Sequence, residues 1–222
     1  MKLFIDSANV EQIKKINNDY PVDGVTTNPS LIAKENRSLF PLINEIRNII
    51  GETKLLFVQT ISVDSDSIVN EALQIWENLN RNVIIKIPVT VEGIRAIGIL
   101  KKHGVKTLAT TVYTPMNAYI AAKAGANFVA PYVNRIENLN GNGTQVIKEI
   151  RQIFSNAKFS SEIISASFKN VQQIKAVSLS GSDGITVNPQ LIEKFLQVPS
   201  IKEDVQQFNL DWETVRDEVD SN

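Results

Sequence analysis

Short runs of apolar and β-branched residues alternate along the chain with longer segments whose apolar positions are spaced three to four apart. The short runs have the length and composition of buried strands. They are Lys2–Ser7, Gly24–Asn28, Leu55–Thr60, Val83–Val89, Lys106–Val112, Phe128–Val133, Glu162–Phe168 and Gly184–Asn188. The longer segments, such as the one with Ile94, Ile97 and Leu100, have the period of amphipathic helices. The pattern therefore predicts a parallel sheet built from βαβ units.

The number of these units indicates a closed barrel. Eight βα units in 222 residues predict a (β/α)8 barrel of the TIM type, near the small end of the range for that fold. A doubly wound open sheet is the alternative, because the number of strands does not show whether the sheet closes. No low-complexity linker divides the chain, so we expect one domain over residues 1–222, with residues 200–222 as a C-terminal helical extension.

One stretch of the sequence occurs twice in similar form. The segment GVTTNPSLI at Gly24–Ile32 resembles GITVNPQLI at Gly184–Ile192. Both predict a strand whose Asn-Pro corner begins the next helix. We interpret the repeat as two corners with the same local solution rather than as a shared function.

The C-terminal extension has the pattern of an amphipathic helix, with a break expected near Asn209. Most of its other positions are polar or acidic, and its apolar residues follow the helical spacing. They are Ile201, Val205, Phe208, Trp212, Val215 and Val219. Two interpretations are open: the helix covers its own barrel, or it reaches a neighbouring subunit, where Trp212 is the kind of residue that anchors an interface.

Composition and charge exclude several classes of protein. The chain has 23 basic and 24 acidic side chains, which leaves no electrostatic footprint for a nucleic acid or an anionic membrane. Cysteine is absent and His103 is the one histidine, so thiol chemistry and multi-histidine metal sites are excluded. No apolar run has the length of a membrane span, and Asp6 comes too early for a signal peptide, so a cytoplasmic location is expected.

A single lysine interrupts a strongly apolar predicted strand. In VIIKIPV (Val83–Val89), alternation puts Lys86 on the face opposite Ile85 and Ile87. If that apolar face packs on the helices, Lys86 points into the barrel near its C-terminal mouth, where burial lowers the pKa of an amine. Such an amine is a nucleophile toward carbonyl groups. The alternative is a structural lysine paired with a buried carboxylate.

Polar residues lie near the ends of other predicted strands. They are Asp6, Asn28, Gln59, Thr110, Tyr132 and Ser167. Two positions before each lies a residue that we expect to point inward: Phe4, Thr26, Phe57, Leu108, Ala130 and Ser165. The same parity puts the polar residues in one upper layer with Lys86, a set that suits carbonyl chemistry with proton transfers. Taken singly, each is also explained as a strand-end cap or turn residue.

Arg135 follows the sixth predicted strand. Beside Ser167 and Lys169, its planar guanidinium is suited to holding a phosphate. The alternative is a surface ion pair with Glu137.

Four segments together resemble the small transaldolase family, which includes the fructose-6-phosphate aldolases, and the resemblance extends over nearly the whole chain. Gly24–Ile32 resembles the first signature of the family. VIIKIPVTVEG (Val83–Gly93) resembles the active-site signature, whose lysine forms a Schiff base. APYVNR (Ala130–Arg135) and ASFK (Ala166–Lys169) match as well. The resemblance implies a class I aldolase mechanism that needs neither a metal nor another cofactor.

The resemblance also implies roles for individual residues. Lys86 would form the imine with the C2 carbonyl of a ketose phosphate, and Asp6 would transfer a proton at the C4 hydroxyl. Asn28 would hydrogen-bond the substrate, and Arg135 and Ser167 would hold its phosphate. The family further implies a homo-oligomer, a pentamer or a decamer, with the C-terminal helix at subunit contacts.

Gln59, Thr110 and Tyr132 would hold the water that relays protons to the imine. True transaldolases typically have glutamate at the position of Gln59 and phenylalanine at that of Tyr132, so the resemblance favours an aldolase. That enzyme would cleave fructose 6-phosphate to dihydroxyacetone and glyceraldehyde 3-phosphate. The alternatives are a transaldolase of the pentose phosphate pathway, which transfers the dihydroxyacetone unit between sugar phosphates, and a non-catalytic barrel that binds a sugar phosphate.

Overall fold

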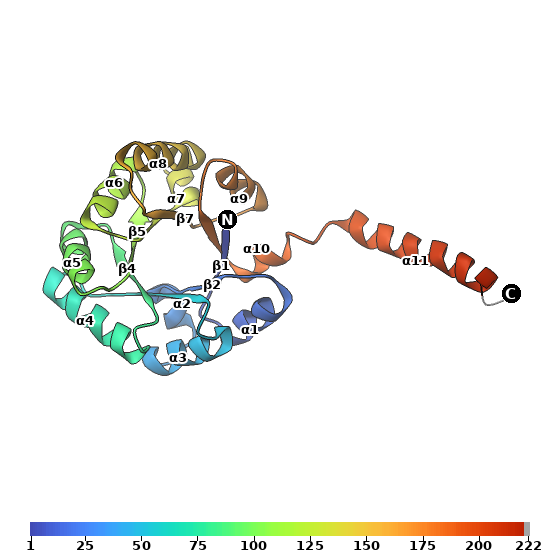
Figure 1. Ribbon diagram of the computed structural model, residues 1–222, viewed down its shortest axis with the longest axis horizontal. Coiled ribbons are helices and arrows are strands. Elements are labelled where there is room, and N and C mark those ends of the chain that lie inside the picture. The colour runs from blue at the N-terminus through green and yellow to red at the C-terminus, as the bar shows by residue number, and fades with distance from the viewer. Residues whose placement is uncertain (220–222) are drawn as a thin grey trace.

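Eight parallel strands close into a barrel in chain order, with β1 paired to both β2 and β8 (Figure 1). The computed structural model describes the backbone of residues 1–219 and the side chains of residues 1–213. The strands are β1 Lys2–Asp6, β2 Gly24–Thr26, β3 Leu55–Gln59, β4 Ile84–Pro88, β5 Thr107–Val112, β6 Phe128–Pro131, β7 Glu162–Ser165 and β8 Gly184–Val187. The predicted (β/α)8 barrel is confirmed, and the open sheet is excluded.

Helices surround the barrel, and most strands end earlier than predicted because their last residues turn into the loops that lead to these helices. The helices are α1 Val10–Asp19, α2 Pro29–Lys34, α3 Leu39–Ile50, α4 Ser65–Asn78, α5 Val91–Lys102, α6 Pro115–Ala124, α7 Val133–Asn138, α8 Gly143–Ala157, α9 Val171–Ser178, α10 Pro189–Glu193 and α11 Pro199–Val219.

The two repeated corners are alike: the side chains of Asn28 and Asn188 cap α2 and α10 by accepting from Leu31 N and Leu191 N.

Two apolar clusters form the core. The larger one lies between the strands and the helices, and it contains Ile85 and Ile87 of β4. The smaller one fills the barrel interior with Phe4, Phe57, Ile84, Leu108, Phe128, Ala130 and Ile164. Phe57 packs edge-on against Phe4 and Phe128, with ring centroids 5.2 and 5.5 Å apart. This aromatic plug occupies the positions that precede the polar strand ends, so side chains at the C-terminal mouth line the space above it.

Strand β7 has the opposite phase to the one predicted. Ile164 points into the barrel, whereas Ser165 was expected to do so. The hydroxyl of Ser165 instead lies 2.8 Å from that of Ser182 on the loop before β8. The prediction for Ser165 is therefore wrong, and the reason is that β7 begins at Glu162 with its even-numbered residues inward.

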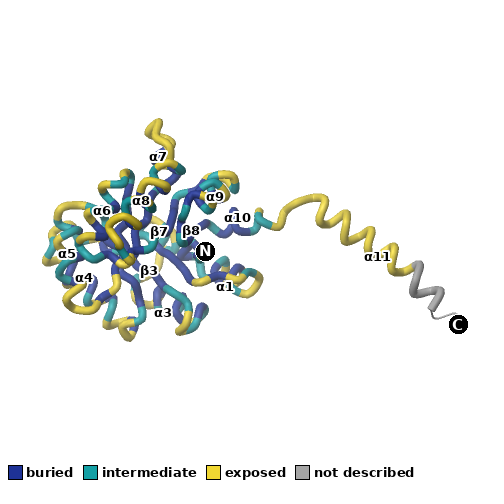
Figure 2. The backbone as a smooth tube through the Cα atoms, turned by 45° about the horizontal axis from the view of Figure 1, so that its top comes forward, coloured by how far each residue is buried: buried dark blue, intermediate teal, exposed yellow. Residues whose placement is uncertain are grey.

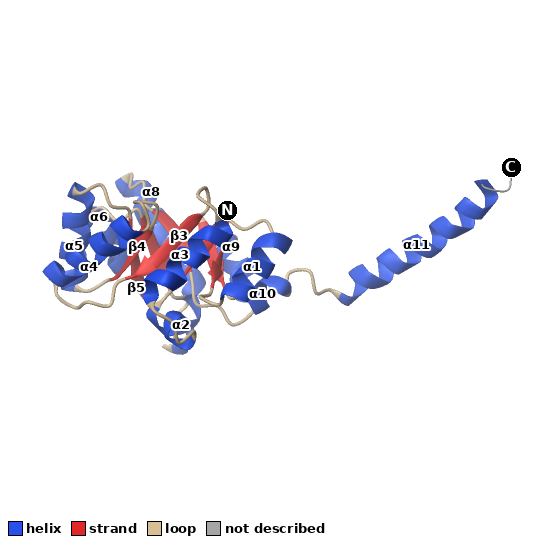
Figure 3. Ribbon diagram, turned by 90° about the horizontal axis from the view of Figure 1, so that it is seen from below, coloured by secondary structure: helices blue, strands red, loops and turns tan. Residues whose placement is uncertain are grey.

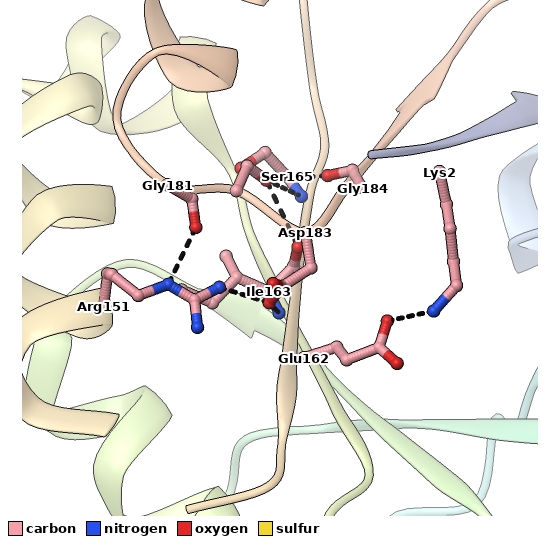
Figure 4. A network of polar contacts seen from close by, with 9 residues as sticks. Lys2, Arg151, Glu162, Ile163, Ser165, Gly181, Asp183 and Gly184 are labelled. Atoms are coloured by element: carbon pink, nitrogen blue, oxygen red, sulfur yellow. Dashed lines mark hydrogen bonds and ion pairs between the residues drawn. The ribbon is translucent and has the colours of Figure 1, made fainter. Parts of the chain in front are cut away.

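A polar network fastens the closing strands at the N-terminal end of the barrel (Figure 4). Lys2 of β1 pairs with Glu162 of β7, and Arg151 of α8 pairs with Asp183 before β8. The same Asp183 carboxylate accepts a hydrogen bond of 2.7 Å from the backbone of Ile163. These contacts join α8, β7, β8 and β1, and they fix the seam where the first and last strands meet.

Arg47 of α3 is a second buried clamp, only 5% exposed. Its guanidinium donates to the carbonyl groups of Gly51, Lys54 and Asn82 at 2.7, 2.8 and 2.6 Å. Those carbonyls belong to the segments that lead into β3 and β4. A single side chain therefore supplies a hydrogen-bond donor to three backbone carbonyl groups at this end of the barrel.

Helix α11 projects away from the barrel, and its described side chains are exposed (Figures 1 and 2). It is one unbroken helix, so the expected break near Asn209 is wrong. Phe208 and Trp212 are 67 and 68% exposed, and the helix does not cover its own barrel (Figure 3). Within residues 1–219, no helix is both long and apolar enough to cross a membrane.

Candidate active site

A cavity of about 160 Å³ opens at the C-terminal end of the barrel, above the aromatic plug. Seven of the predicted site residues line it: Asp6, Asn28, Lys86, Thr110, Tyr132, Arg135 and Ser167. Thr26, Leu108, Ala130, Ile164, Ala166 and Thr186 complete the lining. The barrel thus brings together side chains from almost every strand end, as expected for a site on this fold.

Lys86 lies on β4 at the floor of this cavity and is 6% exposed. Its amine donates to the carbonyl of Thr27 at 2.5 Å. In the described part of the chain no carboxylate lies within ion-pair distance of the amine, so the structure does not support a structural lysine locked to an acid. Burial lowers the pKa of the Lys86 amine from its ordinary value of 10.5, and the charge of Asp6 opposes this shift. The free amine needed for attack on a carbonyl is thereby favoured.

Asp6 is the last residue of β1 and has a hydrogen bond from the neighbouring strand. Thr26 Oγ1 of β2 donates to Asp6 Oδ1 at 2.9 Å. Thr26 Oγ1 also lies 2.5 Å from Thr186 Oγ1 of β8. The sequence analysis did not single out either threonine as functional, although both occupy the same place in the repeated stretch.

Tyr132 and Thr110 form a second polar pair, with their hydroxyl oxygens 2.8 Å apart. Burial raises the pKa of Tyr132, while the hydrogen bond with Thr110 and the charge of Arg135 oppose that shift. The phenol therefore stays protonated near neutral pH and is available as a hydrogen-bond donor. Tyr113, which the sequence analysis also missed, packs edge-on against the Tyr132 ring with centroids 5.9 Å apart.

Two backbone irregularities aim side chains into the cavity. The pairing of β5 with β6 shifts between Ala109 and Val112, and Thr111 in the bulge has a φ of 59°. A β-branched residue rarely adopts this conformation, and here it leaves Thr110 pointing inward while Val112 packs in the outer core. Ser167 has a φ of 63°, which turns its side chain into the cavity although Ser165 points away.

Arg135 contacts the Tyr132 ring and does not form the surface ion pair with Glu137 that was the alternative. Its guanidinium carbon lies 4.6 Å from the centroid of the Tyr132 ring, and the side chain lines the cavity. Glu137, the alternative partner, instead accepts a hydrogen bond of 2.5 Å from Gln173. Lys169, which was expected beside Arg135, does not line the cavity. Among the described residues Arg135 has no ion-pair partner, so its positive charge is available to an anion that enters the cavity.

Gln59 is the predicted site residue that the structure does not place in the cavity lining. Its backbone pairs in register with Lys86 at the end of β3, as alternation requires. The residue lines a neighbouring hollow together with Ile61 and Val91, both of which are exposed. Its Oε1 atom is buried, and no hydrogen-bond partner for it is present in the described residues.

The cavity combines a buried amine, a carboxylate, paired hydroxyl groups and a guanidinium, which is the set required to attack a carbonyl, move protons and hold an anion. A comparison with protein families agrees with this chemistry. The family described as Transaldolase/Fructose-6-phosphate aldolase matches residues 3–221, nearly the entire length of the sequence. The chain belongs to this family of enzymes.

Proposed function

We propose that the protein is a class I aldolase that cleaves fructose 6-phosphate to dihydroxyacetone and glyceraldehyde 3-phosphate. The observation that carries this proposal is the Lys86 amine, which is buried at the floor of the cavity and has no acid partner in the described residues. An amine in this state attacks a ketone readily, and its protonated imine withdraws electrons from the neighbouring carbon.

The reaction begins when Lys86 Nζ attacks C2 of the ketose, and loss of water gives the protonated imine. Asp6 takes the proton of the C4 hydroxyl, and the C3–C4 bond breaks with its electron pair moving toward the imine. The aldehyde leaves with its carbonyl at C4, and the three-carbon unit remains as an enamine on Lys86. Protonation at C3 and hydrolysis of the imine then release dihydroxyacetone and the free amine.

Arg135, Ser167 and Asn28 are proposed to hold the substrate. The guanidinium of Arg135 lines the cavity, where it suits a phosphate through charge-assisted hydrogen bonds. Ser167 and Asn28 line the same cavity and supply short polar side chains. The proposal puts the phosphate near α7, which carries Arg135, and the reacting carbons between Lys86 and Asp6.

Release of the three-carbon unit, rather than its transfer, is supported by Tyr132. Its phenol lies 2.8 Å from Thr110 Oγ1, and its raised pKa keeps it protonated. This pair is proposed to position the water that protonates the enamine, and Gln59 is proposed to approach that water from the end of β3 when substrate is bound. A transaldolase differs from this scheme because the enamine attacks a second aldose phosphate instead.

The test is borohydride reduction of the protein with fructose 6-phosphate, followed by mass spectrometry of peptides. We expect an adduct at Lys86 and release of free dihydroxyacetone without any acceptor. An adduct combined with a strict need for erythrose 4-phosphate would assign the transferase activity instead. The absence of any adduct would leave only a sugar-phosphate-binding barrel and would overturn the proposal.

We also propose that the protein is a homo-oligomer, a pentamer or decamer, in which α11 packs on a neighbouring copy. Its apolar stripe includes Ile201, Val205, Phe208 and Trp212, all of which are about half exposed or more. An isolated stripe of this kind is rare on a monomer because its burial is favourable. Removal of residues 199–222 should convert the oligomer to a monomer in light scattering, and an unchanged mass would contradict the assignment.

A further inference from the structure

Two threonines from the repeated stretches meet above the barrel plug. Thr26 and Thr186 occupy the same position in GVTTNP and GITVNP, and β1 lies between their strands. Thr26 is 1% exposed and Thr186 is 5% exposed, and both line the cavity. Their hydroxyl oxygens are 2.5 Å apart. The repeat therefore has a consequence beyond its two helix corners, because it puts paired hydroxyl groups on either side of the strand that bears Asp6.

The direction of these hydrogen bonds follows from the number of protons. A threonine hydroxyl has one proton to donate and two lone pairs to accept with. Thr26 donates its proton to Asp6 Oδ1 at 2.9 Å. The short contact between the two threonines therefore requires Thr186 to donate to Thr26. The result is a one-way chain from Thr186 through Thr26 to the carboxylate of Asp6.

We propose that Thr186 is a positioning residue for Asp6, acting through Thr26, and that it fixes the carboxylate for proton transfer at the C4 hydroxyl. The inference rests on the proposed function, because it assigns a means of support to one of its proton-transfer groups. Thr26 provides the one side-chain hydrogen bond to Asp6 within the described residues. The hydrogen bond that Thr26 accepts from Thr186 favours the orientation in which Thr26 donates to Asp6, and it strengthens that second bond.

The hydrogen bonds from Thr186 through Thr26 engage one of the two carboxylate oxygens of Asp6. Oδ1 of Asp6 accepts from Thr26, and no hydrogen bond reaches Oδ2 within the described residues, so Oδ2 is the oxygen available to take the substrate proton. Without Thr186, Thr26 can donate to other acceptors in the cavity, and Asp6 loses its orientation. The step that suffers is cleavage of the C3–C4 bond. Formation of the imine at Lys86 does not use this carboxylate proton transfer and continues.

The experiment replaces Thr186 by valine, which keeps the β-branched shape and removes the hydroxyl. We expect kcat for cleavage of fructose 6-phosphate to fall by about tenfold, as for a misplaced catalytic group, and KM to change by less than about twofold. Trapping of Lys86 by borohydride should be unchanged. Deuterium exchange from solvent into dihydroxyacetone should also be unchanged, because enamine formation from that ketone involves no C4 hydroxyl. Thr186→Ser should restore cleavage, since serine supplies the same donor.

The matched control is Ser165→Ala on the adjacent strand. It also removes a buried hydroxyl from a side-chain pair, but this hydroxyl bonds to Ser182 and points away from the cavity. It should lower stability without changing kcat. Thr186→Ala is measured in parallel, so that a folding defect of the valine variant does not decide the outcome.

Three outcomes would overturn the inference. Wild-type kcat in the valine and alanine variants would show that Asp6 needs no support from β8. Equal losses of cleavage, trapping and deuterium exchange would show that Thr186 only maintains the cavity. Failure of Thr186→Ser to restore cleavage would show that shape rather than the hydroxyl matters. Failure of the proposed function is recognised separately in the wild-type protein, which would then give either no adduct or an adduct without release of dihydroxyacetone when no acceptor is added.

Discussion

Replacing Lys86 by methionine should abolish the borohydride adduct and should also stabilise the fold at neutral pH. The lysine amine is buried with a single hydrogen bond, to the carbonyl of Thr27. Burying a polar group without full compensation costs about 1–3 kcal/mol, and the lost hydrogen bond contributes about 1 kcal/mol. The difference is a gain of up to about 2 kcal/mol, since methionine fills the same space with an unbranched apolar chain. For a chain of this length that corresponds to a rise in Tm of up to about 8 °C.

The pH dependence of this gain has a definite sign. The folded-state pKa of Lys86 lies below its ordinary value of 10.5 because of burial. Between these two pKa values the unfolded chain binds a proton that the folded chain does not, so the stability of the wild-type protein rises with pH there. The methionine variant has no such group. Its advantage is therefore largest below the folded-state pKa and shrinks as the pH approaches 10.5.

The assay is urea unfolding of both proteins at about pH 7 and about pH 10, the latter close to the ordinary lysine pKa. Lys102→Met on α5 is the matched control, because Lys102 is exposed and its replacement should change stability by less than about 0.5 kcal/mol. A methionine variant less stable than the wild type at pH 7 would refute the reasoning. So would an advantage that grows with pH, because the buried amine would then not be the source of the penalty.

Three further substitutions test other parts of the structure. Tyr132→Phe should shift the products from free dihydroxyacetone toward transfer to an added aldose phosphate, and an unchanged ratio would argue against a role for the phenol. Arg135→Gln should raise KM for fructose 6-phosphate by about 10–100-fold, the value of a lost charge-assisted hydrogen bond, while an equal effect on unphosphorylated fructose would contradict phosphate binding. Arg47→Met should lower the free energy of unfolding by about 3 kcal/mol or more, because three carbonyl groups lose a charged donor. A loss below about 1 kcal/mol in urea unfolding would show that water replaces the guanidinium at those carbonyls.

Strand alternation predicts side-chain direction well where a strand is regular. Lys86 lies in the middle of β4, and the structure has both predicted faces of that strand: Ile85 and Ile87 pack toward the helices, and Lys86 points into the barrel. The same reasoning fails for Ser165, because the starting phase of β7 is set by its pairing with β6 and not by its own apolar residues. Ser167 reaches the cavity only through a left-handed backbone conformation that no hydrophobic pattern encodes.

Contacts between strands that are distant in the sequence could not be predicted from the hydrophobic pattern. The pattern does not indicate a functional role for Thr186, because its partner, Thr26, is remote in the sequence and the two residues meet only when the barrel closes. Gln59 lines a neighbouring hollow instead of the cavity, and its strand position alone does not determine which of the two it lines. The apolar stripe of α11 predicts a helix, but its direction away from the barrel depends on the short segment after α10.

The seam between β1 and β8 determines when the Asp6 carboxylate can acquire its hydrogen-bonded surroundings during biosynthesis. Strand β1, which carries Asp6, is translated before the other seven strands, yet β8, which carries Thr186, is completed only after almost the entire barrel has been translated. Until then β1 lacks one of its two neighbours and exposes an unpaired edge, which favours association with other nascent chains. A message truncated before β8 would therefore yield an aggregation-prone polypeptide rather than a slow enzyme.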